Sequence, residues 1–166
     1  MKLAKSLDRL GTETAFSVLA EAKKLEAAGK PMIHLGLGQP DFKTPKHIVD
    51  AAKKALDDGH HGYVLSNGIL ECRQSVTRKI KKLYNQDIDP ERIIIMPGGK
   101  PTMSYAIQCF GEPGVEIIHP TPAFPIYESM INFTGAKPVP YDLTEDKDLK
   151  FNPEKILSLI TEQTRL

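Results

Sequence analysis

The sequence predicts an α/β fold built around a mainly parallel sheet with flanking helices. Short apolar runs alternate with amphipathic segments throughout the second half of the chain. The apolar runs are residues 92–96, 115–120 and 137–143, and the amphipathic segments are residues 101–110, 124–133 and 153–161. This alternation is typical of strands joined by helical connections. The length of 166 residues, 40% of them hydrophobic, suits one domain or part of a larger one.

The first half of the chain predicts three helices. The first runs through "ETAFSVLAEAKKLEAAGK", with Thr12 or Thr14 as its cap and Gly29 as its stop. A short extended segment, "MIHLGLG", and a turn then precede a second helix that begins at Pro45 and ends near Asp57. A loop rich in Gly and Asn follows, and apolar residues at helical spacing in "ILECRQSVTRKIKKLY" predict the third helix.

The charge pattern argues against a nucleic acid or a membrane as partner. Basic and acidic residues nearly cancel, 22 against 21, so no overall field attracts either polyanion. Lys79, Lys81 and Lys82 form a basic helix face without interleaved aromatic residues, which we interpret as solvent-exposed. The opening segment "MKLAKSLDRLGTETAF" has no continuous apolar core, so we expect no signal peptide or membrane span and a cytoplasmic protein.

The cysteines and histidines predict no metal site. Cys72 and Cys109 lie far apart without ligand spacing, which favours reduced packing thiols over a disulfide. His60 and His61 are adjacent in a predicted turn, where their side chains diverge. We therefore expect no bound metal.

The stretch "IIIMPGGKPTM" predicts an anion-binding turn. An apolar β-branched run passes through Gly98, Gly99 and Lys100 into a helix, so that backbone N–H groups and the helix N-terminus face an anion. Pro101 suits the first helical turn but lacks an N–H. The donors are therefore mainly Gly99 and Lys100, with the Thr102 hydroxyl as an addition.

Two common phosphate motifs are excluded at this turn. A mononucleotide P-loop requires glycine where Ile94 stands and Ser or Thr where Pro101 stands. The stretch "GLGQPD" begins like a dinucleotide fingerprint but precedes a Pro-containing turn in place of a helix. A Gly-Gly turn that only reverses the chain is the alternative left open by these residues.

Four stretches together carry a family resemblance. "LGLGQPDFKTP", "GYVLSNGILECR", "MPGGKPTM" and "HPTPAFPIYESM" resemble, in order and spacing, the amino-terminal half of class I aminotransferases, the pyridoxal-phosphate enzymes of fold type I that include the aspartate aminotransferases. The likeness covers residues 10–166. It implies that the chain is an amino-terminal fragment, with residues 1–42 as the arm and small-domain segment and residues 43–166 as the first part of a truncated large domain.

The resemblance assigns roles to single residues. It implies that Gly98, Gly99 and Lys100 bind the phosphate of pyridoxal 5′-phosphate through the main chain and that Phe124 stacks on its ring. It further implies that Tyr63 donates to the cofactor phosphate of the neighbouring subunit of a homodimer, and that Gly38 lies against the substrate carboxylate. From the residues alone, Phe124 suits a core position as well as a stacking one, an ordinary loop tyrosine is the favoured interpretation of Tyr63, and Gly38 also suits a turn before Pro40.

The implied activity is amino-group transfer between an α-amino acid and a 2-oxo acid. We expect no catalytic residue within this chain, because the family's Schiff-base lysine, the aspartate beside the pyridinium nitrogen and the carboxylate-binding arginine match none of its residues. The fragment alone is therefore expected to be inactive. The alternatives are a lyase of the same fold, such as one that cleaves carbon–sulfur bonds, and a non-catalytic aminotransferase-like effector domain.

Overall fold

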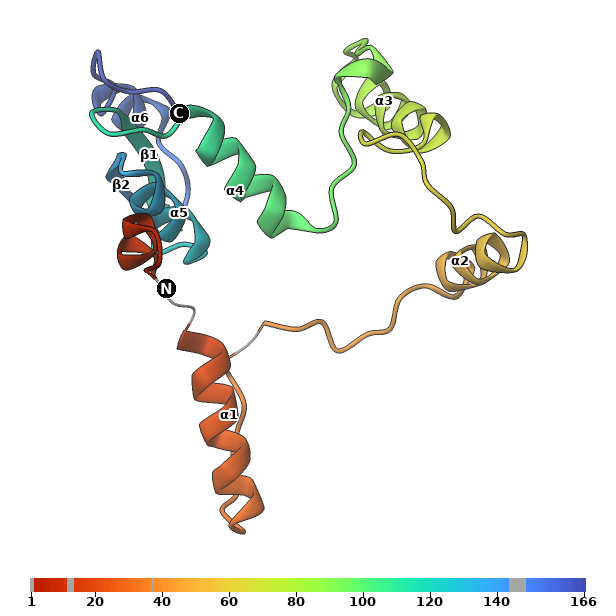
Figure 1. The fold of residues 1–166 in the computed structure, drawn as a ribbon, viewed down its shortest axis with the longest axis horizontal. Helices are drawn as coiled ribbons and strands as arrows, with labels where there is room; N and C mark the ends of the chain where they lie inside the picture. The colour runs from red at the N-terminus through yellow and green to blue at the C-terminus, as the bar shows by residue number, and fades with distance from the viewer. Residues whose placement is uncertain (1, 12–13, 37, 144–148) are drawn as a thin grey trace. The chain divides into compact units, whose positions relative to one another are not determined.

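The computed structural model describes residues 2–11, 14–36, 38–143 and 149–166. The chain divides into two compact units, one of residues 1–37 and 98–166 and the other of residues 38–97 (Figure 1). The first unit contains the 3-10 helix η1 (Lys5–Arg9), α1 (Thr14–Ala27), α4 (Gly99–Phe110), β1 (Glu116–Thr121), α5 (Ile126–Thr134), β2 (Lys137–Asp142) and α6 (Pro153–Ser158). The second unit contains α2 (Lys46–Asp57), α3 (Leu70–Tyr84) and the 3-10 helix η2 (Pro90–Arg92).

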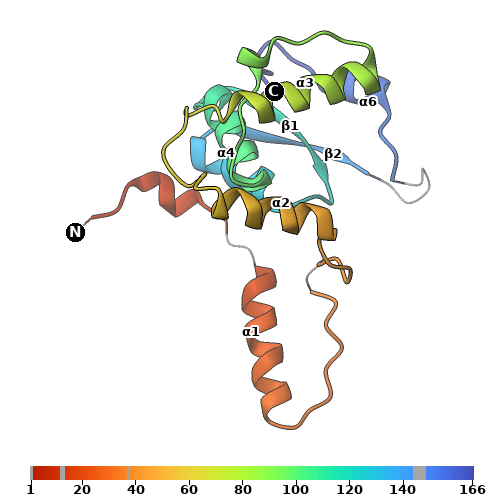
Figure 2. The ribbon, with the colours of Figure 1, turned by 90° about the vertical axis from the view of Figure 1, so that its right-hand side faces the viewer.

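A short parallel sheet forms the centre of the first unit. β1 and β2 run side by side, with Glu116 opposite Lys137 and Thr121 opposite Asp142 (Figure 2). On the other edge of β1, residues 163–166 also run parallel to it. The Glu116 N–H donates to the Gln163 carbonyl at 2.9 Å, and the Ile118 N–H donates to the Leu166 carbonyl at 2.9 Å. β1 is therefore the central strand.

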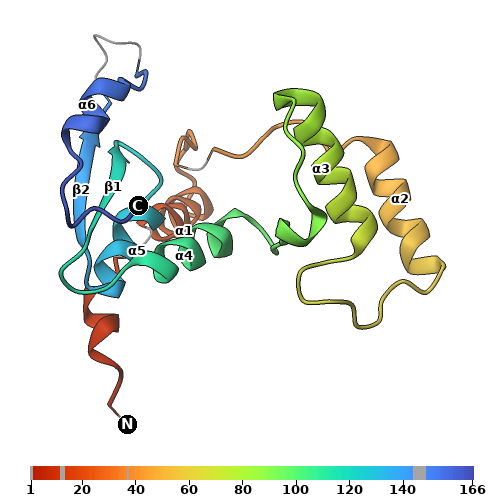
Figure 3. The same ribbon diagram turned by 90° about the horizontal axis from the view of Figure 1, so that it is seen from above.

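Helices cover both faces of this sheet. α4 and α5 pack together against one face (Figure 3). The buried side chains between them and the sheet are those of Ile107, Val115, Ile117, Met130, Ile131 and Ala136. On the other face, Ile156 of α6 and Ile160 line a groove with Ile118 and Tyr141. Neighbouring strand residues such as Ile117 and Ile118 thus serve opposite layers, as the two-residue period of a strand requires.

The second unit is held by an arginine. The Arg73 side chain on α3 is 2% exposed and donates to the carbonyls of Gly68 at 3.1 Å and Pro90 at 3.0 Å. Gly68 has a φ of 95°, a conformation that glycine adopts without strain. These bonds tie the loop before α3 to η2, because a guanidinium offers several donors in a fixed fork.

The predicted α/β fold with a parallel sheet is confirmed, with three corrections. Residues 92–96 are not a strand: Ile94 is 65% exposed, and the Ile95 N–H donates to the Asn67 carbonyl of a turn, so no ladder forms. α4 begins at Gly99, two residues before the predicted start at residue 101. η1 was not predicted. The domain boundary at residue 42 stays a prediction.

Candidate functional site

The turn before α4 is where the sequence predicts an anion cradle. Gly98 is the N-cap of α4, with φ 104° and ψ 169°, a conformation that side chains rarely adopt. A Cβ placed on Gly98 would meet nothing within 4 Å, and one placed on Gly99 would meet only Met103 Cε at 3.6 Å. Neither glycine is therefore crowded on the side where a Cβ would lie, and the first turn of α4 carries free N–H groups and the positive end of the helix dipole.

Thr102 differs from its expected role. Its hydroxyl donates to the Gly98 carbonyl at 3.1 Å, so its proton is used inside the turn in place of reaching a ligand. Pro101, within α4, contributes no N–H. The N–H groups of Gly99 and Lys100 at the start of α4 therefore stay the predicted backbone donors.

Two aromatic rings lie beside this turn. The Lys100 ammonium is 5.4 Å from the ring centroid of Phe124, which follows β1 on the loop to α5. It is also 5.4 Å from the ring centroid of Phe16, near the start of α1. The structure therefore brings the predicted phosphate turn and the predicted stacking ring together. Nothing in the local pattern around Phe16 singles it out, because its contact with Lys100 is purely tertiary.

Two other predicted site residues, Gly38 and Tyr63, belong to the second unit. A Cβ on Gly38 would meet nothing within 4 Å, so the backbone there is open to close approach. The Tyr63 side chain is fully exposed on the loop between α2 and α3. Their roles toward a substrate and a neighbouring subunit stay predictions.

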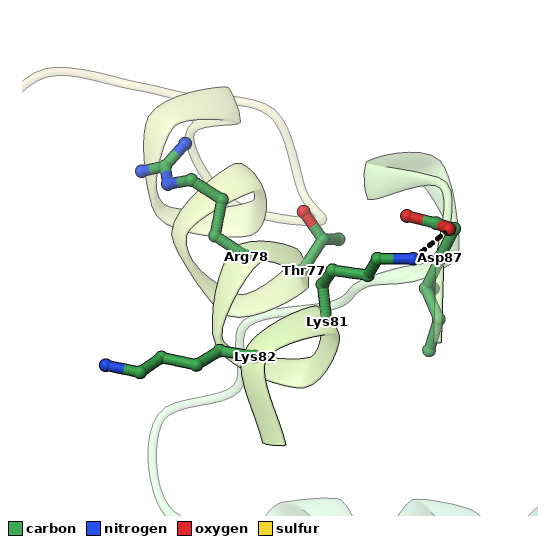
Figure 4. A pocket seen from close by; sticks show the side chains of 6 residues that line it. Thr77, Arg78, Lys81, Lys82 and Asp87 are labelled. Atoms are coloured by element: carbon green, nitrogen blue, oxygen red, sulfur yellow. Dashed lines mark hydrogen bonds and ion pairs between the residues drawn. The ribbon is translucent and has the colours of Figure 1, made fainter. Parts of the chain in front are cut away.

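A cleft of about 330 Å³ on α3 is lined by Thr77, Arg78, Lys81, Lys82, Asp87 and Ile88 (Figure 4). Its cations do not converge. Lys81 pairs with Asp87 at 2.5 Å, while the side chains of Arg78 and Lys82 extend away from Asp87. Arg78 donates to the Ser75 hydroxyl at 2.7 Å on its own helix. The predicted exposure of this basic helix face is confirmed.

Cys72 and Cys109 are free thiols. Within the described ranges, no group of three or more His, Cys, Asp or Glu side chains is gathered closely enough to hold a metal ion. Among the helices of the same described residues, none combines the length and the apolar character that crossing a bilayer requires.

Comparison with known proteins identifies the family. Residues 30–166 match the aminotransferase class I and II family. The chain belongs to this family. Its members generally depend on pyridoxal phosphate. The predicted recognition, made from four short stretches, is confirmed, and so is the assignment to an enzyme family of transferases.

Relatives within the aminotransferase family span bacteria and archaea. The chain is 38% identical over 165 residues to an aspartate aminotransferase of Bacillus subtilis, covering 99% of this chain and 42% of the relative. It is 41% identical over 142 residues to a (5-formylfuran-3-yl)methyl phosphate transaminase of Methanocaldococcus jannaschii, covering 86% of this chain and 38% of that protein.

Solved aminotransferases share the fold. An aspartate aminotransferase from Thermus thermophilus, solved with maleate, superimposes with a TM-score of 0.90 at 28% identity, covering 99% of this chain and 43% of that one. An alanine aminotransferase from Pyrococcus furiosus gives 0.89 at 29% identity, with 98% and 42% covered. The chain thus spans about two fifths of the length of the relatives that it matches.

Proposed function

We propose that the complete protein containing this chain is a pyridoxal-phosphate-dependent aminotransferase that moves an amino group between an α-amino acid and a 2-oxo acid. The observation that carries the proposal is the Gly98–Gly99 turn at the start of α4. A Cβ on either glycine would meet no close contact, and the ammonium of the next residue, Lys100, lies 5.4 Å from the centroid of the Phe124 ring. Family membership supports the same reaction class. The aminotransferase names of the relatives favour it over a lyase or an effector domain.

Each site residue has a defined task in this proposal. The N–H groups of Gly99 and Lys100 bind the cofactor phosphate at the positive end of α4. Phe124 orients the cofactor ring by stacking on it. Bound pyridoxal phosphate supplies the carbonyl group that carries the amino group and the ring that accepts electrons. Gly38 leaves room for the carboxylate of the substrate.

The proposed assembly is a cytoplasmic homodimer in which Tyr63 acts on the site of the partner. Its side chain, fully exposed within the second unit, is available to a neighbouring molecule. In the complete protein, residues 1–42 would contribute the arm and small-domain segment, and residues 43–166 the first part of the large domain. These assignments rest on the family resemblance.

The cradle is tested in the complete protein with Gly99→Asp and Gly99→Asn. The two side chains have equal size, and a Cβ at Gly99 meets only an ordinary contact with Met103, so their difference isolates the charge. An aspartate near a helix N-terminus does not weaken the helix, but it repels a phosphate. We expect Gly99→Asp to lower the affinity for pyridoxal phosphate at least about tenfold more than Gly99→Asn. Equal affinities would contradict the cradle.

The reaction is tested by product analysis with a panel of amino donors that includes aspartate and alanine. An aminotransferase converts donor and 2-oxo acid into a new pair of the same classes without releasing ammonia. A lyase releases ammonia or a sulfur compound. Release of either product without formation of a new amino acid would overturn the proposal.

Tyr63 is tested by mixing two variants, Gly99→Asp and Tyr63→Phe. If Tyr63 acts in trans, a mixed dimer combines both defects in one site and leaves the other site intact. Activity then rises above that of either variant alone. If Tyr63 acts within its own subunit, both sites of the mixed dimer are defective and mixing restores nothing.

A further inference from the structure

The loop that carries Tyr63 ends in a turn that is packed within the second unit. The Gly68 N–H donates to the Leu65 carbonyl at 2.9 Å, which closes a turn that begins two residues after Tyr63. The Ile95 N–H donates to the Asn67 carbonyl at 3.1 Å. A Cβ on Gly68 would lie 2.7 Å from Ile95 Cγ1, so the glycine backbone is in close contact with this side chain. The last residues of the loop are therefore fixed against the segment that follows η2.

Arg73 holds the same turn from inside the unit. Its Nε donates to the Gly68 carbonyl at 3.1 Å, and its Nη1 donates to the Pro90 carbonyl at 3.0 Å and to Glu91 at 2.7 Å. One planar guanidinium thus joins the turn to η2, because its donors point in several fixed directions. The Arg73 side chain is 2% exposed, and any further chain that packs on this unit can only cover it more. These bonds therefore lie in the interior of the unit.

We propose that Arg73 is a positioning residue for Tyr63, because it holds Gly68 against η2 and so fixes the turn that follows the tyrosine. The inference rests on the proposed role of Tyr63 as a donor to the cofactor phosphate of the neighbouring subunit. A hydroxyl donates well only when it lies about 2.5–3.0 Å from its acceptor, so a displaced turn weakens this bond. Arg73 itself contacts neither the cofactor nor the substrate in this proposal.

The same helix offers a matched control. Arg78 also lies on α3, and its guanidinium donates to the Ser75 hydroxyl of α3 itself at 2.7 Å. Arg78→Met therefore removes an equal charge from the helix without touching the turn. Arg73→Met removes the donors that hold the turn. Arg73→Lys keeps the charge, but one ammonium on a flexible stem does not reproduce the fork that joins the turn to η2.

The first measurement is the affinity of the complete protein for pyridoxal phosphate in a double-mutant cycle. Tyr63→Phe alone should lower the affinity about tenfold, since it removes a hydrogen bond to a charged group. Arg73→Met alone should lower it about threefold or more. In the Tyr63→Phe background, Arg73→Met should lower it by less than about twofold, because the bond that it positions is already absent. Arg78→Met should leave the affinity unchanged.

The cycle separates positioning from a general loss of structure. Equal losses of affinity for Arg73→Met in the wild-type and Tyr63→Phe backgrounds would show that Arg73 does not act through Tyr63, and would overturn the proposal. A loss in Arg78→Met as large as that in Arg73→Met would do the same. Arg73→Lys should behave as Arg73→Met does, and a wild-type affinity in Arg73→Lys would show that charge alone suffices.

Mixed dimers give a second readout that general damage to a subunit cannot imitate. An Arg73→Met subunit and a Gly99→Asp subunit, each with its own affinity tag, are purified as a heterodimer. If Arg73 acts only through Tyr63 in trans, the cradle of the Arg73→Met subunit receives an intact Tyr63 from its partner. One of the two sites should then bind pyridoxal phosphate with wild-type affinity. A heterodimer without such a site would overturn the proposal.

Gly68→Ala approaches the turn from its other side and serves if Arg73→Met does not fold. The added Cβ meets Ile95, and the φ of 95° at Gly68 disfavours alanine, so the turn shifts while the guanidinium remains. The affinity for pyridoxal phosphate should fall about threefold or more, and by less than about twofold in the Tyr63→Phe background. Unchanged affinity in folded Gly68→Ala, or equal losses in both backgrounds, would overturn the proposal.

Amide hydrogen exchange distinguishes a failure of this inference from a failure of the proposed function. In the complete protein without cofactor, amides of residues 63–68 should exchange about fivefold faster or more in Arg73→Met than in Arg78→Met. Equal exchange in the two variants would show that Arg73 does not hold the turn. If Tyr63→Phe binds pyridoxal phosphate as wild type does, the proposed role of Tyr63 fails, and the positioning role fails with it even where the exchange differs.

Discussion

Arg73 donates a hydrogen bond of 2.7 Å to Glu91, although the Arg73 side chain is 2% exposed and the Glu91 side chain is 67% exposed. The two partners of this ion pair therefore contribute unequally to the stability of the fold. Arg73 also satisfies the carbonyls of Gly68 and Pro90. Glu91 keeps most of its contact with water and loses little when the pair is broken.

Removing one partner should accordingly cost far more than removing the other. We expect Glu91→Gln to lower the free energy of unfolding by at most about 1 kcal/mol. Arg73→Met leaves the carbonyls of Gly68 and Pro90 without their donor, beside an apolar side chain, and should lower the free energy of unfolding by about 2–4 kcal/mol. Urea unfolding of the complete protein and its two variants measures both values. Equal losses would contradict the asymmetry.

Glu116 should make stability depend on acid pH. The Lys137 ammonium at 2.7 Å, followed by the Thr161 hydroxyl at 2.8 Å, holds the pKa of the Glu116 carboxyl below its ordinary value. The depressed pKa contributes stability that is present above the unfolded value, about 4.3, and is lost as the pH falls through the folded pKa. The advantage of wild type over Glu116→Gln should therefore shrink at acid pH.

Unfolding free energies of wild type and Glu116→Gln, measured from neutral pH down through this range, check the sign. Glu112→Gln, which removes an exposed carboxylate just before β1, controls for the loss of one negative charge. A difference between wild type and Glu116→Gln that stays constant with pH would refute the assignment.

Tyr141 should stabilise the fold through its hydroxyl as well as its ring. The side chain is 3% exposed, its ring stacks on Phe151, and its hydroxyl accepts from the Asn152 N–H at 2.7 Å. Tyr141→Phe leaves that N–H without its acceptor and should cost about 1–3 kcal/mol. Tyr105→Phe, at a side chain 57% exposed, should cost less than about 0.5 kcal/mol. Thermal or urea unfolding compares the two, and matching losses would speak against the bond.

Gly111 should tolerate no side chain. A Cβ at this position would lie 2.5 Å from Thr134 Oγ1 and 2.8 Å from the Ile107 carbonyl oxygen. Gly111→Ala therefore forces α4 and α5 apart locally and should cost about 1–3 kcal/mol. Gly36→Ala, where a Cβ would meet nothing within 4 Å, should change stability by no more than about 0.5 kcal/mol. The same unfolding measurement distinguishes them; a neutral Gly111→Ala would contradict the packing between the helices.

Sequence patterns predicted the helices and strands that depend on local periodicity. β1 and β2 lie within one residue of the predicted runs, because short apolar runs between helical segments mark the strands of such a fold. Residues 92–96 show the limit of this reasoning. An apolar β-branched run favours an extended backbone, but a strand also needs a neighbour to bond with, and pairing is a tertiary property.

The candidate site was predictable to the same extent. Gly98 and Gly99 stand out in the sequence as a pair before a helix, and the structure gives a positive φ to Gly98 and no close Cβ contact to either residue. Phe124 followed from the family resemblance. Phe16 was missed because nothing in its local pattern separates a ring on an exposed helix face from one that meets a distant lysine. The same holds for Arg73, a charged residue within a polar helix that becomes the most buried side chain of α3.

The order of strands around β1 has a consequence for where chemistry can occur. The chain passes from β1 through α5 to β2 on one edge, then through α6 back to residues 163–166 on the other edge. The two connections therefore run in opposite directions across the sheet. Because such crossovers are right-handed, they cover opposite faces of it. A crevice opens at the carboxyl ends of strands where this reversal occurs. β1 ends at Thr121, and Phe124 follows on that rim. The position of Phe124 is thus set by the order of the strands. The loop after β1 can therefore change its side chains, and with them a ligand site, while the sheet stays intact.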